Sequence, residues 1–176
     1  MVLHWNVVHD ASNDWWNYTY WFRHARTETR HLILQAPTDL EAGDIFNVRG
    51  MFGGYEFGDF RADAENPGMP DAMHGIRFYD TWNLTTRIQF SSLRSPAWGD
   101  FYAVGHNFAS LGTDRAWNTG FTGDDSDPVA PPTNRSLQHH LPVPDKMATV
   151  VPEPATLLLL AGGLLALGGM QRRRRG

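Results

Sequence analysis

The chain has 176 residues and a formal net charge of −4, with 41% hydrophobic and 19% charged residues. This composition excludes a disordered chain, and the negative charge argues against nucleic-acid binding by the chain as a whole. The chain contains no cysteine, which excludes disulfide frameworks, thiolate zinc sites and cysteine nucleophiles. The sequence therefore indicates more about the topology of the chain than about any catalytic activity.

Uneven residue distribution divides the chain into three zones. All aromatic residues lie between Trp5 and Phe121, and seven of the 11 prolines lie within residues 128–154. An uncharged apolar stretch follows, and the chain then ends in an arginine cluster and a glycine. These shifts predict a body over 1–127, a proline-rich linker over 128–151 and a tail over 152–176. Residues 1–154 hold 11 basic and 19 acidic residues, a net charge of −8.

The apolar residues of the body follow the period of two that is typical of β-strands. The pattern is clearest from Trp82 to Phe90, where every second residue is apolar or Thr and the residues between are polar. Strands are predicted, in chain order, at residues 15–22, 30–36, 44–51, 55–60, 76–79, 82–91, 97–104 and 115–121. Turn residues separate several of them, and no window of the body has a helical period. The predicted fold is all-β, an antiparallel sandwich or a jelly-roll-like body.

After Pro154 the sequence predicts an apolar helix over residues 155–170. At about 1.5 Å per residue it reaches roughly 24 Å, which is short for a membrane core of about 30 Å. Its apolar residues surround the whole helix, and the linker separates it from the body, so a membrane helix is preferred to a buried helix of the body. The residues expected in the membrane are Ala155, Leu157, Leu158, Leu159, Leu160, Leu164, Leu165, Leu167 and Met170.

Four consecutive arginines, Arg172, Arg173, Arg174 and Arg175, follow this helix. Basic residues beside a membrane segment stay on the cytoplasmic side, so they predict a cytoplasmic C-terminus and a body outside the cytoplasm. The alternative is a basic patch for nuclear import or nucleic-acid binding, which the acidic body disfavours.

The order Val151-Pro152-Glu153-Pro154, apolar helix and terminal arginines resembles the PEP-CTERM sorting tail of Gram-negative bacteria. The resemblance implies export, transient anchoring in the inner membrane, and cleavage near Pro-Glu-Pro by exosortase, a membrane enzyme with a cysteine nucleophile. It also implies delivery to the cell surface or to the exopolysaccharide matrix. Pro152, Glu153 and Pro154 are then a substrate motif for another enzyme and not catalytic residues. A Pro-x-Pro segment suits this role because its backbone is stiff and extended.

Proteins with such a tail begin with a signal peptide, which has a basic start, an apolar run and a cleavage site with small residues. The first 30 residues here contain no such run, so we expect the signal peptide to precede Met1. The body segments 66–70 and 96–103 are also similar to bodies often attached to these tails, for which no activity is implied.

Candidate metal ligands are few, and no metal or cofactor is expected. The acidic run at residues 123–128 contains Asp124, Asp125 and Asp127, whose carboxylates are the ligand type that calcium prefers. The run lacks the glycine and glutamate spacing of an EF-hand, so a solvated turn is preferred and calcium binding is the alternative. The adjacent His139 and His140 lie in the linker and are interpreted as solvated.

Three classes of function remain open from the sequence. The preferred class is a non-enzymatic surface or matrix protein with exosortase, the membrane and exopolysaccharide as partners, and no nucleic acid. The second is a carbohydrate-binding module, which requires outward-facing tryptophans in a row on one sheet. The candidates are Trp15, Trp21, Trp98 and Trp117, although core or cross-strand packing is the simpler expectation. The third is a secreted hydrolase, whose catalytic carboxylates would come from Glu28, Glu41, Glu56 and Glu65.

Overall fold

The computed structural model describes residues 2–23, 27–50, 53–79, 85–107, 112–121 and 140–144. These residues form strands and loops, with one 3-10 helix at Ala42–Asp44. The strands are β1 (Val2–Asp10), β2 (Trp15–Arg23), β3 (Thr27–Gln35), β4 (Ile45–Arg49), β5 (Tyr55–Phe60), β6 (Met73–Tyr79), β7 (Thr85–Ser92), β8 (Pro96–Gly99), β9 (Phe101–Asn107), β10 (Gly112–Trp117) and β11 (Leu141–Pro144). The prediction of an all-β body is confirmed, whereas the predicted C-terminal helix lies outside the described residues.

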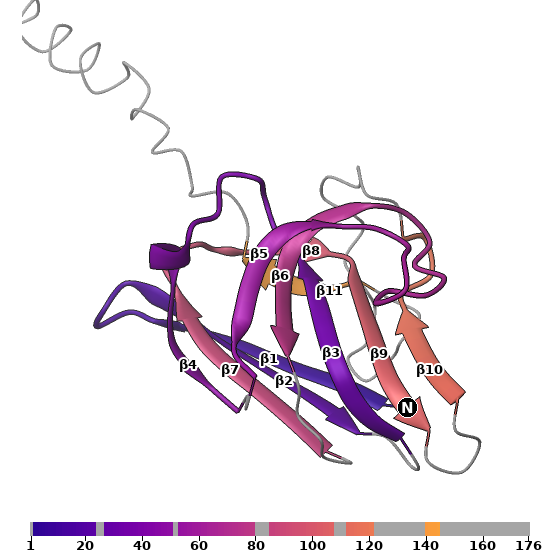
Figure 1. The fold of residues 1–176 in the computed structure, drawn as a ribbon. Helices are drawn as coiled ribbons and strands as arrows, with labels where there is room; N and C mark the ends of the chain where they lie inside the picture. Colours follow the sequence, from indigo (N-terminus) through magenta and orange to yellow (C-terminus); the bar gives the residue numbers. More distant parts are fainter. Residues whose placement is uncertain are drawn as a thin grey trace, which may run out of the picture.

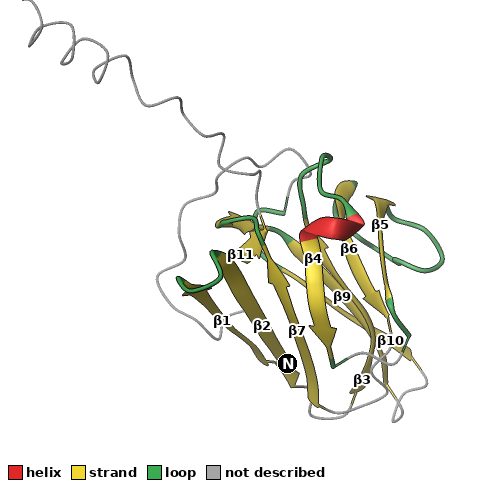
Figure 2. Ribbon diagram, turned by 90° about the vertical axis from the view of Figure 1, so that its left-hand side faces the viewer, coloured by secondary structure: helices red, strands yellow, loops and turns green. Residues whose placement is uncertain are grey.

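The strands form two antiparallel sheets that face each other as a sandwich (Figures 1 and 2). The first sheet has the order β1-β2-β7-β4 and the second has the order β10-β9-β3-β6-β5. Strands β8 and β11 pair as a small third sheet, which lies at the upper end of the sandwich in Figure 1. Each main sheet therefore has one face toward the shared core and one face away from it.

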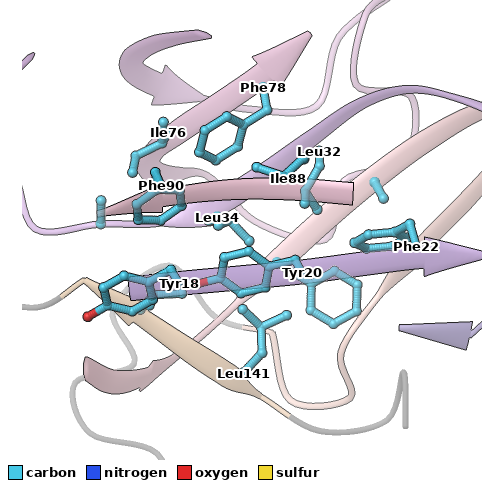
Figure 3. Packing of buried hydrophobic residues seen from close by; sticks show 14 of the residues in the cluster. Tyr18, Tyr20, Phe22, Leu32, Leu34, Ile76, Phe78, Ile88, Phe90 and Leu141 are labelled. Atoms are coloured by element: carbon cyan, nitrogen blue, oxygen red, sulfur yellow. The ribbon is translucent and has the colours of Figure 1, made fainter. Parts of the chain in front are cut away.

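The core between the two sheets is rich in aromatic rings (Figure 3). Phe78 of the second sheet stacks on Phe90 of the first, with ring centroids 5.6 Å apart. Buried tyrosines need a partner for the hydroxyl group. The hydroxyl of Tyr18 donates to the carbonyl of Arg94 at 2.9 Å, and that of Tyr20 donates to the carbonyl of Pro142 at 2.6 Å. Both buried tyrosine hydroxyls therefore have a hydrogen-bond partner.

The predicted alternation is confirmed in β7 and β2. In β7, Ile88 and Phe90 are buried in the core, while Arg87 is exposed on the opposite side of the strand. In β2 the residues Tyr18 and Tyr20 likewise point inward. The predicted strand at 82–91 begins outside the described residues, so the structure does not test the inward position of Trp82.

Two strands were not predicted from the sequence. Strand β1 pairs with β2 along its whole length, and its alternation is weak because His4, Asn6 and Val8 share one side. Strand β11 falls inside the predicted linker, yet it pairs with β8 and all four of its residues are buried. The body therefore extends to Pro144, and the boundary at residue 127 is corrected.

The single strand predicted at 97–104 is divided at Asp100, whose side chain is fully buried. The amide of Asn118 donates to one carboxylate oxygen of Asp100, and Nε2 of His140 lies 3.1 Å from the same oxygen. The backbone N–H of Phe101 donates to Oδ1 of Asn118 at 3.0 Å. Because Asn118 turns inward to make these bonds, β10 ends at Trp117, before the predicted end at residue 121. His140, interpreted from the sequence as solvated, is part of this buried junction.

Residues 61–72 connect β5 to β6 and contribute Met69 to a second apolar cluster on the outer side of the second sheet. Tyr102 in this cluster donates a hydrogen bond to the carbonyl of Pro67 at 2.9 Å. The members of the cluster are Ile33, Phe60, Met69, Met73, Tyr102, Val104 and Phe121. The second sheet is therefore packed on both of its faces.

Candidate functional site

The predicted sorting motif, membrane helix and arginine cluster lie at residues 152–175, outside the described residues. The calcium candidates Asp124, Asp125 and Asp127 also lie outside them and stay a prediction. Within the described ranges no helix has the length and apolar character needed to cross a membrane. The same ranges contain no group of three or more His, Asp or Glu residues placed to hold a metal ion.

Two of the four candidate catalytic carboxylates, Glu56 and Glu65, form salt bridges with the same arginine, Arg77. Arg77 of β6 donates from Nε to Oε1 of Glu56 at 2.8 Å and from Nη1 to Oε2 of Glu65 at 2.7 Å. Its guanidinium also lies between the rings of Phe60 and Tyr79, 4.9 and 4.8 Å from their centroids. These contacts with two carboxylates and two rings restrain the guanidinium.

The charges of this cluster favour a structural role. Burial raises the pKa of Glu56, but hydrogen bonds from Tyr79 and Arg77 outweigh burial and lower the pKa overall. A glycosidase needs one carboxyl group that stays protonated as the acid, and Glu56 is shifted away from that state. Of the other candidates, Glu41 is exposed at the start of the 3-10 helix, and the side chain of Glu28 is not described.

A buried histidine lies next to the same cluster. His31 of β3 is 2% exposed, and its Nε2 lies 3.0 Å from Oδ1 of Asn66. Burial, together with the charge of Arg77, lowers the pKa of His31 to about 4. The imidazole is therefore neutral at pH 7 and joins the loop 61–72 to the sheet as a hydrogen-bonding group.

Two of the four candidate sugar-stacking tryptophans lie on the outer face of the first sheet. Trp15 and Trp21 are both at odd-numbered positions of β2, opposite in direction to the buried Tyr18 and Tyr20. The ring of Trp15 meets Phe46 of β4 edge to face at 5.2 Å. Both tryptophans are half-buried, and they are separated by six residues or roughly 20 Å along the strand.

The other two candidates lie elsewhere. Trp98 of β8 packs edge to face on Trp5 at 5.5 Å. Trp117 of β10 is 39% exposed and stacks on Tyr102 of the second sheet at 6.3 Å. Among the described tryptophans none is fully buried. Trp5 and Trp16 are partly buried against the core, and Trp15 and Trp117 pack on rings of other strands, so the expectation of core or cross-strand packing is confirmed for these four.

A polar hollow of about 290 Å³ lies on the outer face of the first sheet. Its lining residues come from β2, β7 and β4, three strands that run side by side in Figure 2. The register of β2 with β7 places Asn17 opposite Ser91 and Thr19 opposite Gln89. The polar side chains that line the hollow are Asn17, Thr19, Asn47, Arg49, Gln89 and Ser91.

A β-bulge in β4 completes the hollow. The pairing of β4 with β7 shifts between Phe46, which faces Ser91, and Arg49, which faces Gln89. Two residues of β4, Asn47 and Val48, therefore face the single residue Phe90 of β7. Asn47 has a positive φ of 54°, a conformation that asparagine tolerates better than most residues. Gly50 follows at φ +86°, where a Cβ atom would lie 1.7 Å from the carbonyl oxygen of Arg87. The bulge thus brings both Phe46 and Arg49 to the outer face.

Hydrogen bonds across the strands hold the lining of the hollow. Ser91 Oγ donates to Oδ1 of Asn17 at 2.8 Å, and Gln89 Nε2 donates to Oγ1 of Thr19 at 3.2 Å. Each of these amides has further donors or acceptors that bond to no other side chain among the described residues. The lining carries one cation, Arg49, and no carboxylate.

Sequence reasoning did not identify this hollow. It placed the odd-numbered residues of the segment 82–91 on a solvated side, but it did not place this segment next to β2. The only available signal was the presence of amides and hydroxyls, such as Asn17, Thr19 and Gln89, at every second position of two alternating segments.

Comparison with known proteins identifies one feature of the chain, a PEP-CTERM protein-sorting motif at residues 150–175. No curated protein and no solved structure matches the chain. The motif defines a class of exported proteins that are sorted by exosortase, with a membrane-anchored precursor that is processed to the cell surface. The chain is a PEP-CTERM sorting domain-containing protein, as its tail predicted.

Proposed function

We propose that this chain is a non-enzymatic component of the cell surface or of the exopolysaccharide matrix. Exosortase cleaves it near Pro152–Pro154, residues 155–170 anchor the precursor transiently in the inner membrane, and Arg172–Arg175 keep the C-terminus in the cytoplasm. The body lies outside the cytoplasm throughout. The observation that carries this proposal is the sorting motif at residues 150–175.

The non-enzymatic part of the proposal is supported by the state of the candidate carboxylates. Glu56 and Glu65 share Arg77 as a partner, and the lowered pKa of Glu56 opposes a role as general acid. The net charge of −8 on residues 1–154 supports the exclusion of nucleic acid as a partner.

The proposal is tested by processing in bacteria with and without exosortase. The full chain is expressed behind a secretory signal peptide, and its intact mass and its distribution between membrane and extracellular fractions are measured. Loss of the tail and release of the body only when exosortase is present are the expected results. A full-length mass in the soluble fraction of both hosts would refute the membrane and sorting roles.

A pair of matched variants separates the motif from general effects of proline. The double variant Pro152→Ala and Pro154→Ala is expected to remain in the membrane fraction with its tail attached. The double variant Pro131→Ala and Pro132→Ala changes two prolines of the linker outside the motif and is expected to be processed normally. Equal processing of both double variants would contradict a substrate role for Pro-Glu-Pro.

A further inference from the structure

We infer that the polar hollow on the outer face of β2, β7 and β4 binds a neutral oligosaccharide. The inference deepens the proposed function, since it names the ligand class of a body that the sorting motif leaves unassigned. It rests on three observations on the described residues: the chemistry of the lining, the aromatic side chains that precede and follow the lining residues of β2 on the same side of the strand, and the position of the hollow within the sheet.

The lining matches sugar hydroxyls, which donate and accept hydrogen bonds at once. Amides provide one acceptor and two donors on a single side chain, and hydroxyl groups provide both. Asn17 and Gln89 each use part of this capacity across the strands, and Asn47 uses part of it on Ser91 Oγ at 3.4 Å. The remaining amide donors and acceptors are available to a ligand. Thr19 and Ser91 are only 7% and 3% exposed, and their hydrogen bonds hold the amides of Gln89 and Asn17 in place, which lowers the entropic cost of binding.

Aromatic rings flank the amide groups along the direction of β2. Trp15, supported edge-on by Phe46, lies at one end. Trp21 lies at the other end, with the guanidinium of Arg87 5.4 Å from its ring centroid. The lining itself is polar and the rings lie beyond it, and the volume of 290 Å³ is just below the range of about 300–1,000 Å³ for small-molecule sites. The C–H faces of sugar rings pack on aromatic rings as other apolar surfaces do.

Two other ligand classes fit less well. A phosphate-rich ligand requires several cations, whereas the lining has only Arg49 and the body is strongly acidic. An extended peptide binds by pairing with a free sheet edge. One edge of this sheet is β4, but the hollow lies on the face of the sheet and is centred on β7, which is paired with β2 and β4. A neutral chain that needs only side-chain hydrogen bonds and aromatic contacts is the remaining match.

The test measures binding of neutral hexasaccharides by titration calorimetry. The panel contains cello-, laminari-, manno- and malto-oligosaccharides, with oligogalacturonate as an acidic comparison. The full chain is used in a detergent without a sugar headgroup, because such headgroups would occupy the site. We expect at least one neutral oligosaccharide to bind, and Trp21→Ala and Gln89→Ala each to weaken its binding about tenfold or more.

Trp117→Ala is the matched control, since Trp117 is an exposed tryptophan on the other sheet. It is expected to leave binding unchanged, and circular dichroism of all variants checks that the fold is retained. Gln89→Ala keeps the test valid if Trp21→Ala does not fold. The inference is overturned if no neutral oligosaccharide binds, if only oligogalacturonate binds, or if Trp117→Ala weakens binding as much as the hollow variants. The assay needs no exosortase, so its failure is distinct from a failure of the sorting experiment.

Discussion

The outer faces of the two sheets differ sharply, although both sheets share one core. On the second sheet, residues 61–72 add apolar side chains, and Arg77 is enclosed by two glutamates and two aromatic rings. On the first sheet, the corresponding face carries amides and hydroxyls around a hollow with one arginine and no carboxylate. One outer face is thus built as an additional core layer, and the other as a surface with hydrogen-bonding capacity.

This difference separates residues that stabilise the body from residues that are available for binding. Pairs of identical residue types on the two faces make the comparison testable, because a substitution removes the same atoms in two environments. The free energy of unfolding is expected to respond on the second sheet and to change little on the first.

The largest difference is expected between Phe60→Ala and Phe46→Ala. Phe60 is 6% exposed in the second apolar cluster, and replacing a buried phenylalanine by alanine typically costs about 3 kcal/mol or more. Phe46 is half-buried on the first sheet, so its loss is expected to cost roughly 1 kcal/mol. Urea unfolding of the two variants measures both values. Equal losses would show that the loop 61–72 adds no packing layer.

A smaller difference is expected between Arg77→Met and Arg87→Met. Removing Arg77 leaves Glu56 and Glu65 without their shared cation, and we expect a loss of about 2 kcal/mol because both glutamates are partly exposed. Arg87 has a ring contact with Trp21, worth about 0.5–1 kcal/mol at an exposed site. Chemical denaturation at pH 7 provides the measurement. A larger cost for Arg87→Met than for Arg77→Met would reverse the assignment of the two faces.

The smallest expected effect is a pH dependence at His31. Its pKa in the folded protein is about 4, below the ordinary value of about 6.5. Between these values the unfolded state binds more protons than the folded state, so stability falls as pH decreases through this range. From pH 7 to pH 6 the loss from this residue is about 0.7 kcal/mol. His31→Gln is expected to lose less stability than the natural chain over this interval. An identical loss in both proteins would place the titration on other groups.

The elements that were predicted correctly are those whose inner positions are uniformly apolar. In β2 and β7 the residues Tyr18, Tyr20, Ile88 and Phe90 all face the core, so the sequence period is clean. Strand β1 was missed because Val8 lies on the outer side, 50% exposed, opposite Asn17. Apolar and polar residues are therefore mixed on that side of the strand.

Strand β11 was missed for a different reason. Two of its four residues, Pro142 and Pro144, are prolines, which are typical of linkers and are tolerated only at sheet edges. It becomes a strand through contacts that are distant in the sequence, namely pairing with β8 and the hydrogen bond from Tyr20. The polar hollow was missed on the same grounds, because Asn17 and Ser91 meet only through the register of β2 with β7.

The fixed position of β11 sets a short tether. Pro142 accepts a hydrogen bond from Tyr20 in the core, and only residues 145–151 separate Pro144 from Pro152. Even fully extended, this segment reaches less than about 30 Å. In the proposed anchored precursor the body is therefore confined near the membrane, where the effective concentration of neighbouring sites is on the order of millimolar. Under the proposed binding of oligosaccharide by the polar hollow, many anchored copies would hold one polysaccharide chain through individually weak contacts, and the proposed cleavage near Pro-Glu-Pro would remove that avidity at the moment of release.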